Sequence, residues 1–288
     1  MNSATSPRRL RLGLFVQPVG QHVSGWRLTE QLGDPTDIDW LITLAKKAEA
    51  GKFDLFFVGD ALATSMYRLP STMARLEPLT MLAALAVNTR RIGLAATAST
   101  TFSDPFTLAR SFSSLDHISR GRAAWNVVTS FSTDVARNFS RSDMPDHASR
   151  YARAREFLEV ACKLWAGWEE GAVQPDKATG NYFVDEKIQP INHQGEHFQV
   201  QGPLNITRSP QGRPVIIEAG SSADGQKLAA ETAEVIFTAS ASLEEAQSFY
   251  RAQKAQVVAA GRNPDQVVIM PGVMPIIGRT REDAKALW

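Results

Sequence analysis

The sequence predicts an α/β fold of the (β/α)8 TIM-barrel class with insertions, and three observations lead to this prediction. Seven apolar runs of strand length recur along the 288 residues, with helix-like segments between them. The runs are continuously apolar, which is typical of parallel strands buried on both faces. No Gly-x-Gly-x-x-Gly sequence follows the first run, so a dinucleotide-binding doubly wound sheet is not supported. The β–α repeats therefore favour a barrel.

The first half of the chain holds four predicted strands and three predicted helices. The strands cover residues 11–16, 53–60, 91–100 and 122–130. The helices cover residues 39–51, 77–89 and 105–119. Asp37 can cap the first helix and Gly51 can end it. Pro105 suits the first turn of the third helix, because a proline there removes no helical hydrogen bond.

The second half continues the alternation after a long helix over 151–168. On that helix Leu158, Cys162 and Trp165 share one apolar face, so Cys162 is predicted to lie in the core. Residues from about 169 to 210 lack periodicity and contain several Gly, Pro and Asn residues, which indicates an insertion. The remaining strands and helices are predicted at 214–220, 222–231, 233–240, 243–260 and 267–278.

The chain, 1–288, is predicted to form a single barrel domain that is truncated at its C-terminus before the eighth strand. The seventh predicted strand ends near Gly278, and residues 280–288 only begin its following helix. A seven-stranded barrel would leave open backbone edges on its first and seventh strands. Truncation, a neighbouring molecule or the insertion would each account for this gap.

Composition excludes several classes of partner. The chain is 43% hydrophobic and 21% charged with a formal net charge of +1, so no bulk charge attracts nucleic acid or an anionic membrane. No stretch approaches 18 unbroken apolar residues, and no signal peptide is recognised, so no membrane association is expected. The single cysteine is consistent with a reducing, cytoplasmic location.

Polar residues gather at the ends of the predicted strands, which in barrels form the face that carries the chemistry. The second, third and fourth strands end in Asp60, Thr97, Ser99, Asn126, Thr129 and Ser130. Trp125 is predicted to point the other way, outward against the helices. The fifth strand ends in Ser221 and Ser222 just before a helix, where free N–H groups and hydroxyls can hold a phosphate, or where a serine simply caps the helix. Asp60 either faces the site or caps a helix.

Three further residues are candidates for ligand contact. His147 and Tyr151 are spaced i, i+4, so a helix that already starts near Asp146 would place both on one face. The alternative is a surface histidine and a packing tyrosine. His22, in the loop after the first strand, is either a catalytic group or a solvated histidine. No metal site is predicted, since no third ligand accompanies His147. Motifs for nucleophilic catalysis are absent, which favours a cofactor enzyme.

Seven segments in order carry a resemblance to a known family. They are GQHVSGWR, FDLFFVGDAL, EPLTMLAALAVNT, IGLAATASTTFSDPFTLAR, SLDHISRGRAAWNVVTS, HASRYARAREFLEV and EAGSSADG. Together they resemble the bacterial luciferase-like flavin-dependent monooxygenase superfamily, and most closely its nitrilotriacetate monooxygenase, dibenzothiophene-sulfone monooxygenase and pristinamycin synthase family. The resemblance covers the chain from about Leu10 to Trp288.

The resemblance implies FMN, bound as FMNH2 at the strand ends, and a role for each candidate residue. Asp60 and Thr97 would line the flavin with help from Ser99, and Asn126 would form a hydrogen bond near the ring. The phosphate would be held by His147, Tyr151, Ser221 and Ser222. His22 would be the catalytic polar group near the reacting oxygen, although this sequence has Gln21-His22 where the family often has paired histidines.

The implied reaction is a two-component monooxygenation. A separate flavin reductase supplies FMNH2, O2 adds to it to give a peroxyflavin, one oxygen atom enters a small organic substrate, and the other leaves as water. Family chains continue past the position of Trp288 and form homodimers or homotetramers. Two alternatives stay open: a deazaflavin-dependent oxidoreductase of the same superfamily, and a non-catalytic truncated flavin-binding remnant. The substrate is not indicated.

Overall fold

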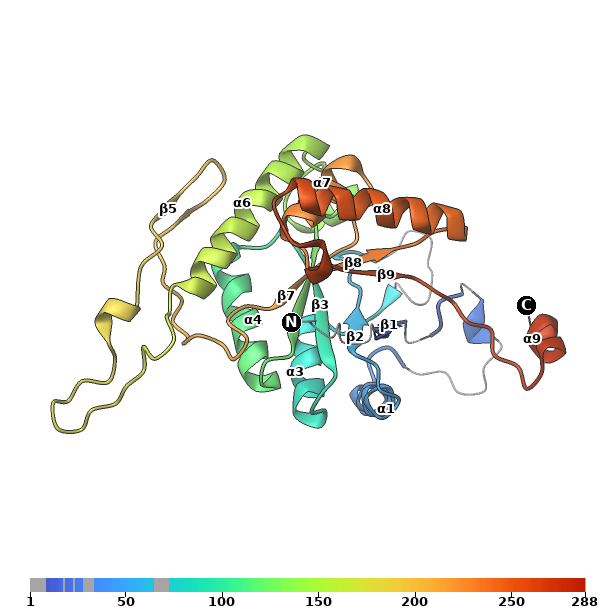
Figure 1. The fold of residues 1–288 in the computed structure, drawn as a ribbon, viewed down its shortest axis with the longest axis horizontal. Helices are drawn as coiled ribbons and strands as arrows, with labels where there is room; N and C mark the ends of the chain where they lie inside the picture. The colour runs from blue at the N-terminus through green and yellow to red at the C-terminus, as the bar shows by residue number, and fades with distance from the viewer. Residues whose placement is uncertain (1–8, 18, 23, 28–33, 65–72, 288) are drawn as a thin grey trace, which may run out of the picture.

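Seven parallel strands form one sheet that curls into a nearly closed barrel with helices outside (Figure 1). The computed structural model describes residues 9–17, 19–22, 24–27, 34–64 and 73–287. Each strand pairs with the next in the order β1-β2-β3-β4-β7-β8-β9. Their bounds are β1 Gly13–Val16, β2 Leu55–Val58, β3 Gly93–Ser99, β4 Ala123–Val128, β7 Val215–Glu218, β8 Val235–Thr238 and β9 Val268–Pro271. The predicted barrel class is confirmed.

The helices follow the strands much as the sequence predicts. They are α1 Ile38–Ala50, α3 Pro78–Asn88, α4 Pro105–Ser119, α5 Thr133–Asn138, α6 His147–Ala166, α7 Ala223–Thr232, α8 Leu243–Ala259 and α9 Arg281–Leu287, with short 3-10 turns η1 Gly25–Arg27, η2 Asp185–Lys187 and η3 Pro264–Gln266. Asp37 caps α1 by accepting the N–H groups of Asp39 and Trp40. Within the described residues, no helix combines the length and the apolar character that crossing a membrane requires.

Two predicted boundaries differ from the structure. α6 already begins at His147, because the Asp146 side chain accepts the Ser149 N–H at 3.0 Å and caps the helix there. β9 ends at Pro271, short of the predicted Gly278. Proline has no backbone N–H to donate to a neighbouring strand, and Pro275 repeats the interruption four residues later.

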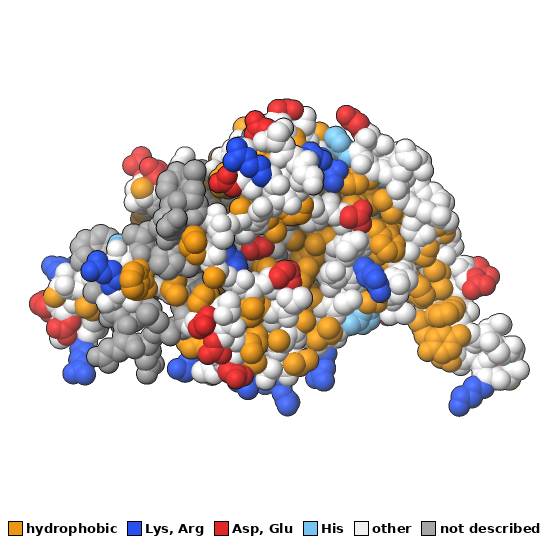
Figure 2. Space-filling model, turned by 180° about the vertical axis from the view of Figure 1, so that it is seen from behind, with side chains coloured by type: hydrophobic (Ala, Val, Ile, Leu, Met, Phe, Trp, Pro, Cys, Tyr) orange, Lys and Arg blue, Asp and Glu red, His pale blue; other side chains and the backbone are white. Residues whose placement is uncertain are grey.

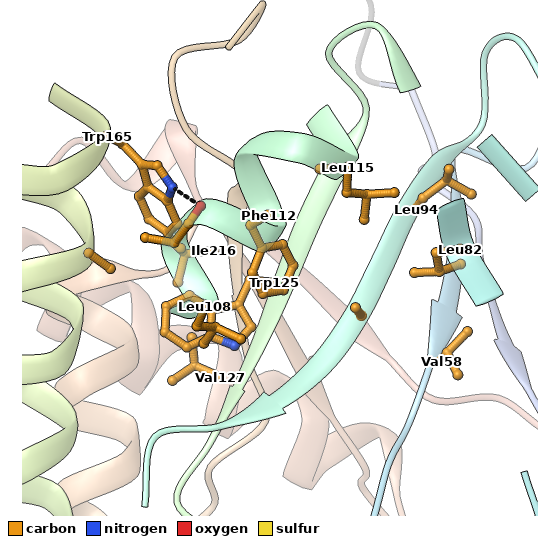
Figure 3. Close-up of a cluster of buried hydrophobic side chains, with 14 of the residues drawn as sticks. Val58, Leu82, Leu94, Leu108, Phe112, Leu115, Trp125, Val127, Trp165 and Ile216 are labelled. Carbon is orange, nitrogen blue, oxygen red and sulfur yellow. Dashed lines mark hydrogen bonds between the residues drawn. The ribbon is translucent and has the colours of Figure 1, made fainter. Parts of the chain in front are cut away.

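The outer face of the sheet holds the main core, and Trp125 of β4 lies at its centre (Figure 3). Its indole is fully buried and packs against Phe112 of α4 and against Phe157 and Trp165 of α6, with ring centroids 5.7, 5.7 and 6.3 Å away. Its Nε1–H donates to the Ala98 carbonyl at 3.1 Å. The prediction that Trp125 packs outward is confirmed.

The inner face of the sheet is filled mainly by small side chains in the middle strands. Ala95, Ala124 and Ile217 form a separate buried cluster there. Side chains alternate between the two faces of a strand. Thr97 therefore shares the inner face with Ala95, and Asn126 shares it with Ala124. This alternation places both predicted polar residues inside the barrel.

The insertion forms an arm that leaves the barrel beside α6 (Figure 1). Its first part closes on itself, because the Gln189 N–H donates to the Gly167 carbonyl at 2.9 Å and Trp168 bridges Ile188. Figure 2 shows hydrophobic side chains gathered on this arm, where Tyr182 is 56% exposed. The arm lies on the side of the barrel away from β1 and β9, so the insertion does not cover their edges.

The returning part of the insertion is tied to α6 by one carboxylate. It contains the small hairpin β5 His193–Gln194 and β6 Gln199–Val200. Glu156 accepts the backbone N–H groups of His197 and Phe198 at 2.9 and 2.8 Å, and His193 Nε2 lies 3.1 Å from it. These hydrogen bonds hold the pKa of the Glu156 carboxyl below its usual value, although its burial acts the other way.

One predicted core residue is wrong. Cys162 is exposed, although Leu158 and Trp165 on the same predicted face are buried. The thiol lines a cleft between α6 and α7 that also holds the ion pair of Arg155 and Glu231. Cys162 therefore marks the border of the apolar face, where the cleft is lined by charged side chains, among them Arg213, Glu231 and Glu234.

The two ends of the sheet approach each other without pairing in the described residues. β1 and β9 stand at opposite ends of the strand order. A Cβ placed on Gly13 of β1 would lie 3.1 Å from the Cε of Met270 of β9, so a methionine side chain occupies the space between the edges. In the part of the chain described here, the sheet has no eighth strand.

Candidate functional site

The inner wall of the barrel is built by a pair of polar residues in register on β3 and β4. The Nδ2–H of Asn126 donates to the Thr97 hydroxyl at 2.9 Å, and that hydroxyl donates to the Val58 carbonyl at 2.8 Å. Both side chains are buried. The Oδ1 atom of Asn126 is also buried and accepts no hydrogen bond from any residue that the structure describes. Because buried polar atoms are normally satisfied, this oxygen is ready to accept a donor from a ligand.

A second polar pair closes the ends of the same two strands. The hydroxyls of Ser99 and Ser130 lie 2.8 Å apart, and either can be the donor. Ser99 also accepts the Thr101 N–H at 3.2 Å. Ser130 has a φ of +45°, a left-handed conformation that is uncommon outside glycine. From the sequence, Ser130 was predicted to lie at a strand end but was not assigned to ligand binding. Its left-handed φ could not be predicted, because serine rarely adopts that conformation.

Asp60 follows β2 and is half-buried at the same end of the barrel. Its burial raises the pKa of the carboxyl, while the Ala61 N–H and the Arg75 guanidinium act in the opposite direction. Arg75 also donates to the Gly59 carbonyl at 3.0 Å, which places its charge beside Asp60. Residues 61–64 are not helical, so Asp60 does not cap a helix in that segment.

The start of α6 meets the start of α7 through four side chains. Ser222 donates to the Tyr151 hydroxyl at 3.2 Å, and His147 Nδ1 lies 3.1 Å from the Asp224 carboxylate. The rings of His147 and Tyr151 have centroids 4.7 Å apart, as expected for residues at i and i+4. Ser222 also caps α7 by accepting the Gly225 N–H at 3.1 Å, so the capping role holds together with the contact to Tyr151.

Two glycines bring the loop after β7 onto the first turn of α7. A Cβ on Gly225 would lie 2.9 Å from the Cα of Gly220 and 2.9 Å from the Tyr151 hydroxyl. Such contacts are too short for any larger residue. The Gly-Ser-Ser-x-x-Gly spacing is the sequence signal that could have revealed this close packing. The close contact of the two glycines thereby places the hydroxyls of Ser222 and Tyr151 beside the N-terminus of α7, where anions are favoured.

Glu218, the last residue of β7, is a functional candidate that the sequence reasoning missed. Its side chain is 4% exposed, and its Oε1 atom is buried without a hydrogen-bond partner in the described part of the chain. Burial raises the pKa of this carboxyl well above its usual value. The sequence signal that could have identified Glu218 is a charged residue at the end of an apolar strand, Val-Ile-Ile-Glu, shortly before the two serines.

Two predicted residues stay apart from these groups. His22 lies exposed in the loop after β1, where its Nδ1 accepts the Ser24 N–H at 3.1 Å. Ser221 is exposed, and only its carbonyl accepts a hydrogen bond, from Gln226 at 2.9 Å. Among the described hydrogen bonds, none joins the His22 or Ser221 side chain to another predicted site residue. Of the others, Thr97, Ser99 and Asn126 form an inner wall on β3 and β4, and His147, Tyr151 and Ser222 form a helix-start cluster where α6 and α7 begin.

The nearly closed parallel barrel, with polar groups at its strand ends, defines an α/β-barrel protein, a class in which ligand sites lie at the C-terminal face of the sheet. The pattern that describes the luciferase-like monooxygenase family matches residues 18–288, and the chain belongs to this family. The resemblance predicted from the sequence is confirmed.

Similarity to known proteins extends over nearly the whole chain. The chain is 50% identical to N-acetyl-S-(2-succino)cysteine monooxygenase of Bacillus subtilis (strain 168). The match covers 98% of this chain and 64% of the relative. It is 45% identical to nitrilotriacetate monooxygenase component A of Aminobacter aminovorans, over 98% of this chain and 65% of that one. A crystal structure of riboflavin lyase with modified FMN and riboflavin superposes with a TM-score of 0.90 at 33% identity, over 97% and 65% of the two chains.

Proposed function

We propose that this protein is the oxygenating component of a flavin-dependent monooxygenase that uses FMNH2. The observation that carries the proposal is the cluster at the start of α7, where Ser222, Tyr151 and His147 come together. It lies at the C-terminal side of the barrel, as does the inner wall of Thr97 and Asn126. A phosphate group and a planar ring with hydrogen-bonding edges would fit these two groups of residues.

The chemistry of the donors and acceptors supports FMN as the cofactor. The unpartnered Oδ1 of Asn126 would accept a ring N–H, with Thr97 fixing the orientation of the amide and with Ser99 and Asp60 nearby. The phosphate would be bound at the N-terminus of α7, which attracts anions, by the hydroxyl and imidazole groups. These four residues are His147, Tyr151, Ser221 and Ser222.

The bound cofactor would supply the reaction of reduced flavin with O2, which delivers one oxygen atom to a small organic substrate and the other to water. The protein's residues would bind and orient the flavin and keep water from the reacting centre. The buried wall of Thr97 and Asn126 suits that second task. His22 is proposed as the group that holds or moves a proton near the reacting oxygen. Its place in a loop on the β1 side leaves it free to face a substrate.

A flavin reductase is the proposed partner, and it would supply FMNH2. The name of the nitrilotriacetate relative, component A, supports a system with more than one component. Assembly as a homodimer or homotetramer and a cytoplasmic location belong to the same proposal, the latter because a single thiol suits a reducing compartment.

The test is to titrate the purified chain with FMN and with riboflavin, oxidised and chemically reduced, and to follow flavin fluorescence. We expect FMN to bind more tightly than riboflavin. A Ser221→Ala/Ser222→Ala double change should weaken FMN binding about a hundredfold or more, because each hydrogen bond to a charged group contributes about 1.5–3 kcal/mol. Riboflavin binding should barely change.

Three outcomes would contradict parts of the proposal. Equal losses for FMN and riboflavin in the double variant would remove the serines from the phosphate site. Preference for a deazaflavin over FMN would favour hydride transfer instead of oxygenation. Binding of no flavin at all would overturn the proposed function. Appearance of oxygen from isotopically labelled O2 in an oxidised product would support oxygenation directly, because FMNH2 consumes O2 with or without a substrate.

A further inference from the structure

Two arginines of α6 bind the loops that follow β3 and β4. The Arg150 guanidinium donates to the Ser130 carbonyl, and its Nε–H donates to the Pro145 carbonyl at 3.1 Å. Arg153 donates to the carbonyls of Thr100 and Ser103 at 3.1 and 3.2 Å. Within the described residues neither guanidinium forms an ion pair. Both are committed to backbone carbonyls at the C-terminal end of the barrel.

The contact of Arg150 falls on a strained residue. Ser130 has the left-handed φ of +45°, which is unfavourable for a residue with a Cβ. Such strain persists only where surrounding contacts hold it, and it is frequent at functional sites. Here two contacts hold it: Arg150 on the carbonyl and Ser99 on the hydroxyl, 2.8 Å away.

The serine pair leaves one hydroxyl hydrogen without an acceptor. Two hydroxyls carry two hydrogens, and their mutual hydrogen bond uses one of them. Ser99 otherwise only accepts, from the Thr101 N–H, and no other acceptor for either serine hydroxyl is present among the described residues. The same inner side of the barrel holds the unpartnered acceptor Asn126 Oδ1. The wall therefore offers one free donor and one free acceptor.

α6 also carries the residues of the helix-start cluster. Arg150 stands in the same turn as His147 and Tyr151, whose side chains meet α7. α6 thus contacts both the helix-start cluster and the loop that follows the inner wall. The side chains of α6 would fix the distance between the helix-start cluster and the inner wall.

We propose that Arg150 is a positioning residue for the flavin ring. It holds Ser130 in the left-handed turn, so that the Ser130 hydroxyl pairs with Ser99 and presents a donor toward the ring edge. This inference rests on the proposed flavin-binding function. Because it concerns the ring and not the phosphate, it predicts a loss that FMN and riboflavin share.

The test compares Arg150→Gln with Arg155→Gln in the full chain. Arg155 is the matched control, since it lies on the same helix but pairs with Glu231 of α7. Dissociation constants for FMN and riboflavin are measured by fluorescence. We expect Arg150→Gln to weaken both flavins by about the same factor, up to roughly tenfold, as for one lost hydrogen bond between neutral groups. Arg155→Gln should change both by less than about twofold.

A double-mutant cycle separates positioning from a general effect on folding. In a Ser130→Ala background the hydroxyl is already gone, so Arg150→Gln should cause little further loss of flavin affinity. Equal losses in both backgrounds, unchanged affinity in Arg150→Gln, or a loss confined to FMN would each overturn the inference. If Arg150→Gln does not fold, Arg150→Lys takes its place in the cycle. A wild-type chain that binds no flavin would overturn the proposed function itself.

Discussion

Substituting Gly225 by alanine tests whether the contact between Gly220 and Gly225 sets the positions of the side chains in the helix-start cluster. The added Cβ would lie 2.9 Å from the Cα of Gly220, 3.2 Å from the carbonyl carbon of that residue, and 2.9 Å from the Tyr151 hydroxyl. Carbon atoms normally approach to about 3.5–4.0 Å. The loop must therefore retreat by about 0.6 Å or more, which would stretch the 3.2 Å bond between Ser222 and Tyr151 beyond hydrogen-bond range.

The expected energy follows from this overlap. Overpacking of this kind costs about 1–3 kcal/mol, and the better helix propensity of alanine returns up to about 1 kcal/mol. For a domain of this size each kcal/mol lowers Tm by about 2–4 °C, so we expect a fall of up to about 12 °C. FMN affinity should fall about tenfold or more, since the hydroxyls that we propose to bind the phosphate would be displaced.

Thermal unfolding and FMN titration of Gly225→Ala measure both effects, with Gly51→Ala as the matched control. Gly51 has an ordinary φ of −73°, and a Cβ there would meet nothing nearer than 3.3 Å. We expect its stability to change by less than about 1 kcal/mol and its FMN affinity to stay the same. A Gly225→Ala variant with wild-type Tm and wild-type FMN affinity would refute the argument that the two glycines must touch.

Two further substitutions test the buried groups. Burial raises the pKa of Glu218 in the folded chain above its value in the unfolded chain, so the folded state keeps this proton longer and its stability falls as pH rises between the two values. Glu218→Gln should remove that fall and be more stable than wild type at neutral pH; an unchanged dependence of Tm on pH would contradict this. Trp125→Ala should lose about 3–5 kcal/mol in denaturant unfolding, because the fully buried indole leaves a cavity among three aromatic rings. A loss below about 1 kcal/mol would mean that the core collapses around the gap.

The barrel could be predicted because its strands are buried on both faces, and such strands read as continuous apolar runs. The polarity at their ends, from Asp60 to Asn126, was equally visible, because each residue follows its strand in the sequence. Cys162 was placed wrongly, since helical spacing identifies a face but not where that face ends. The thiol lines a cleft with Arg213, Glu231 and Glu234, which lie far along the chain from residue 162, so helical spacing could not reveal its surroundings.

The candidate site was predictable only where local spacing decides. His147 and Tyr151 share a helix face by their spacing, but their meeting with Ser222 depends on how α6 packs beside α7. The Gly-Ser-Ser-x-x-Gly spacing indicates the contact between Gly220 and Gly225, but the left-handed turn at Ser130 and the hydrogen bond from Arg150 to its carbonyl are conformational or long-range properties. A single sequence encodes them without displaying them.

The arm that closes on itself has a consequence for how this barrel can diversify. Gln189 and Gly167 meet at its base, joined at 2.9 Å, so the chain leaves and re-enters the body at nearly one point. Closing a loop depends only weakly on its length, about 0.6 kcal/mol for each doubling. Residues between these two positions can therefore lengthen, shorten or change composition while the strands keep their register. The arm between Gly167 and Gln189 can therefore change its sequence and its surface while the barrel stays unchanged.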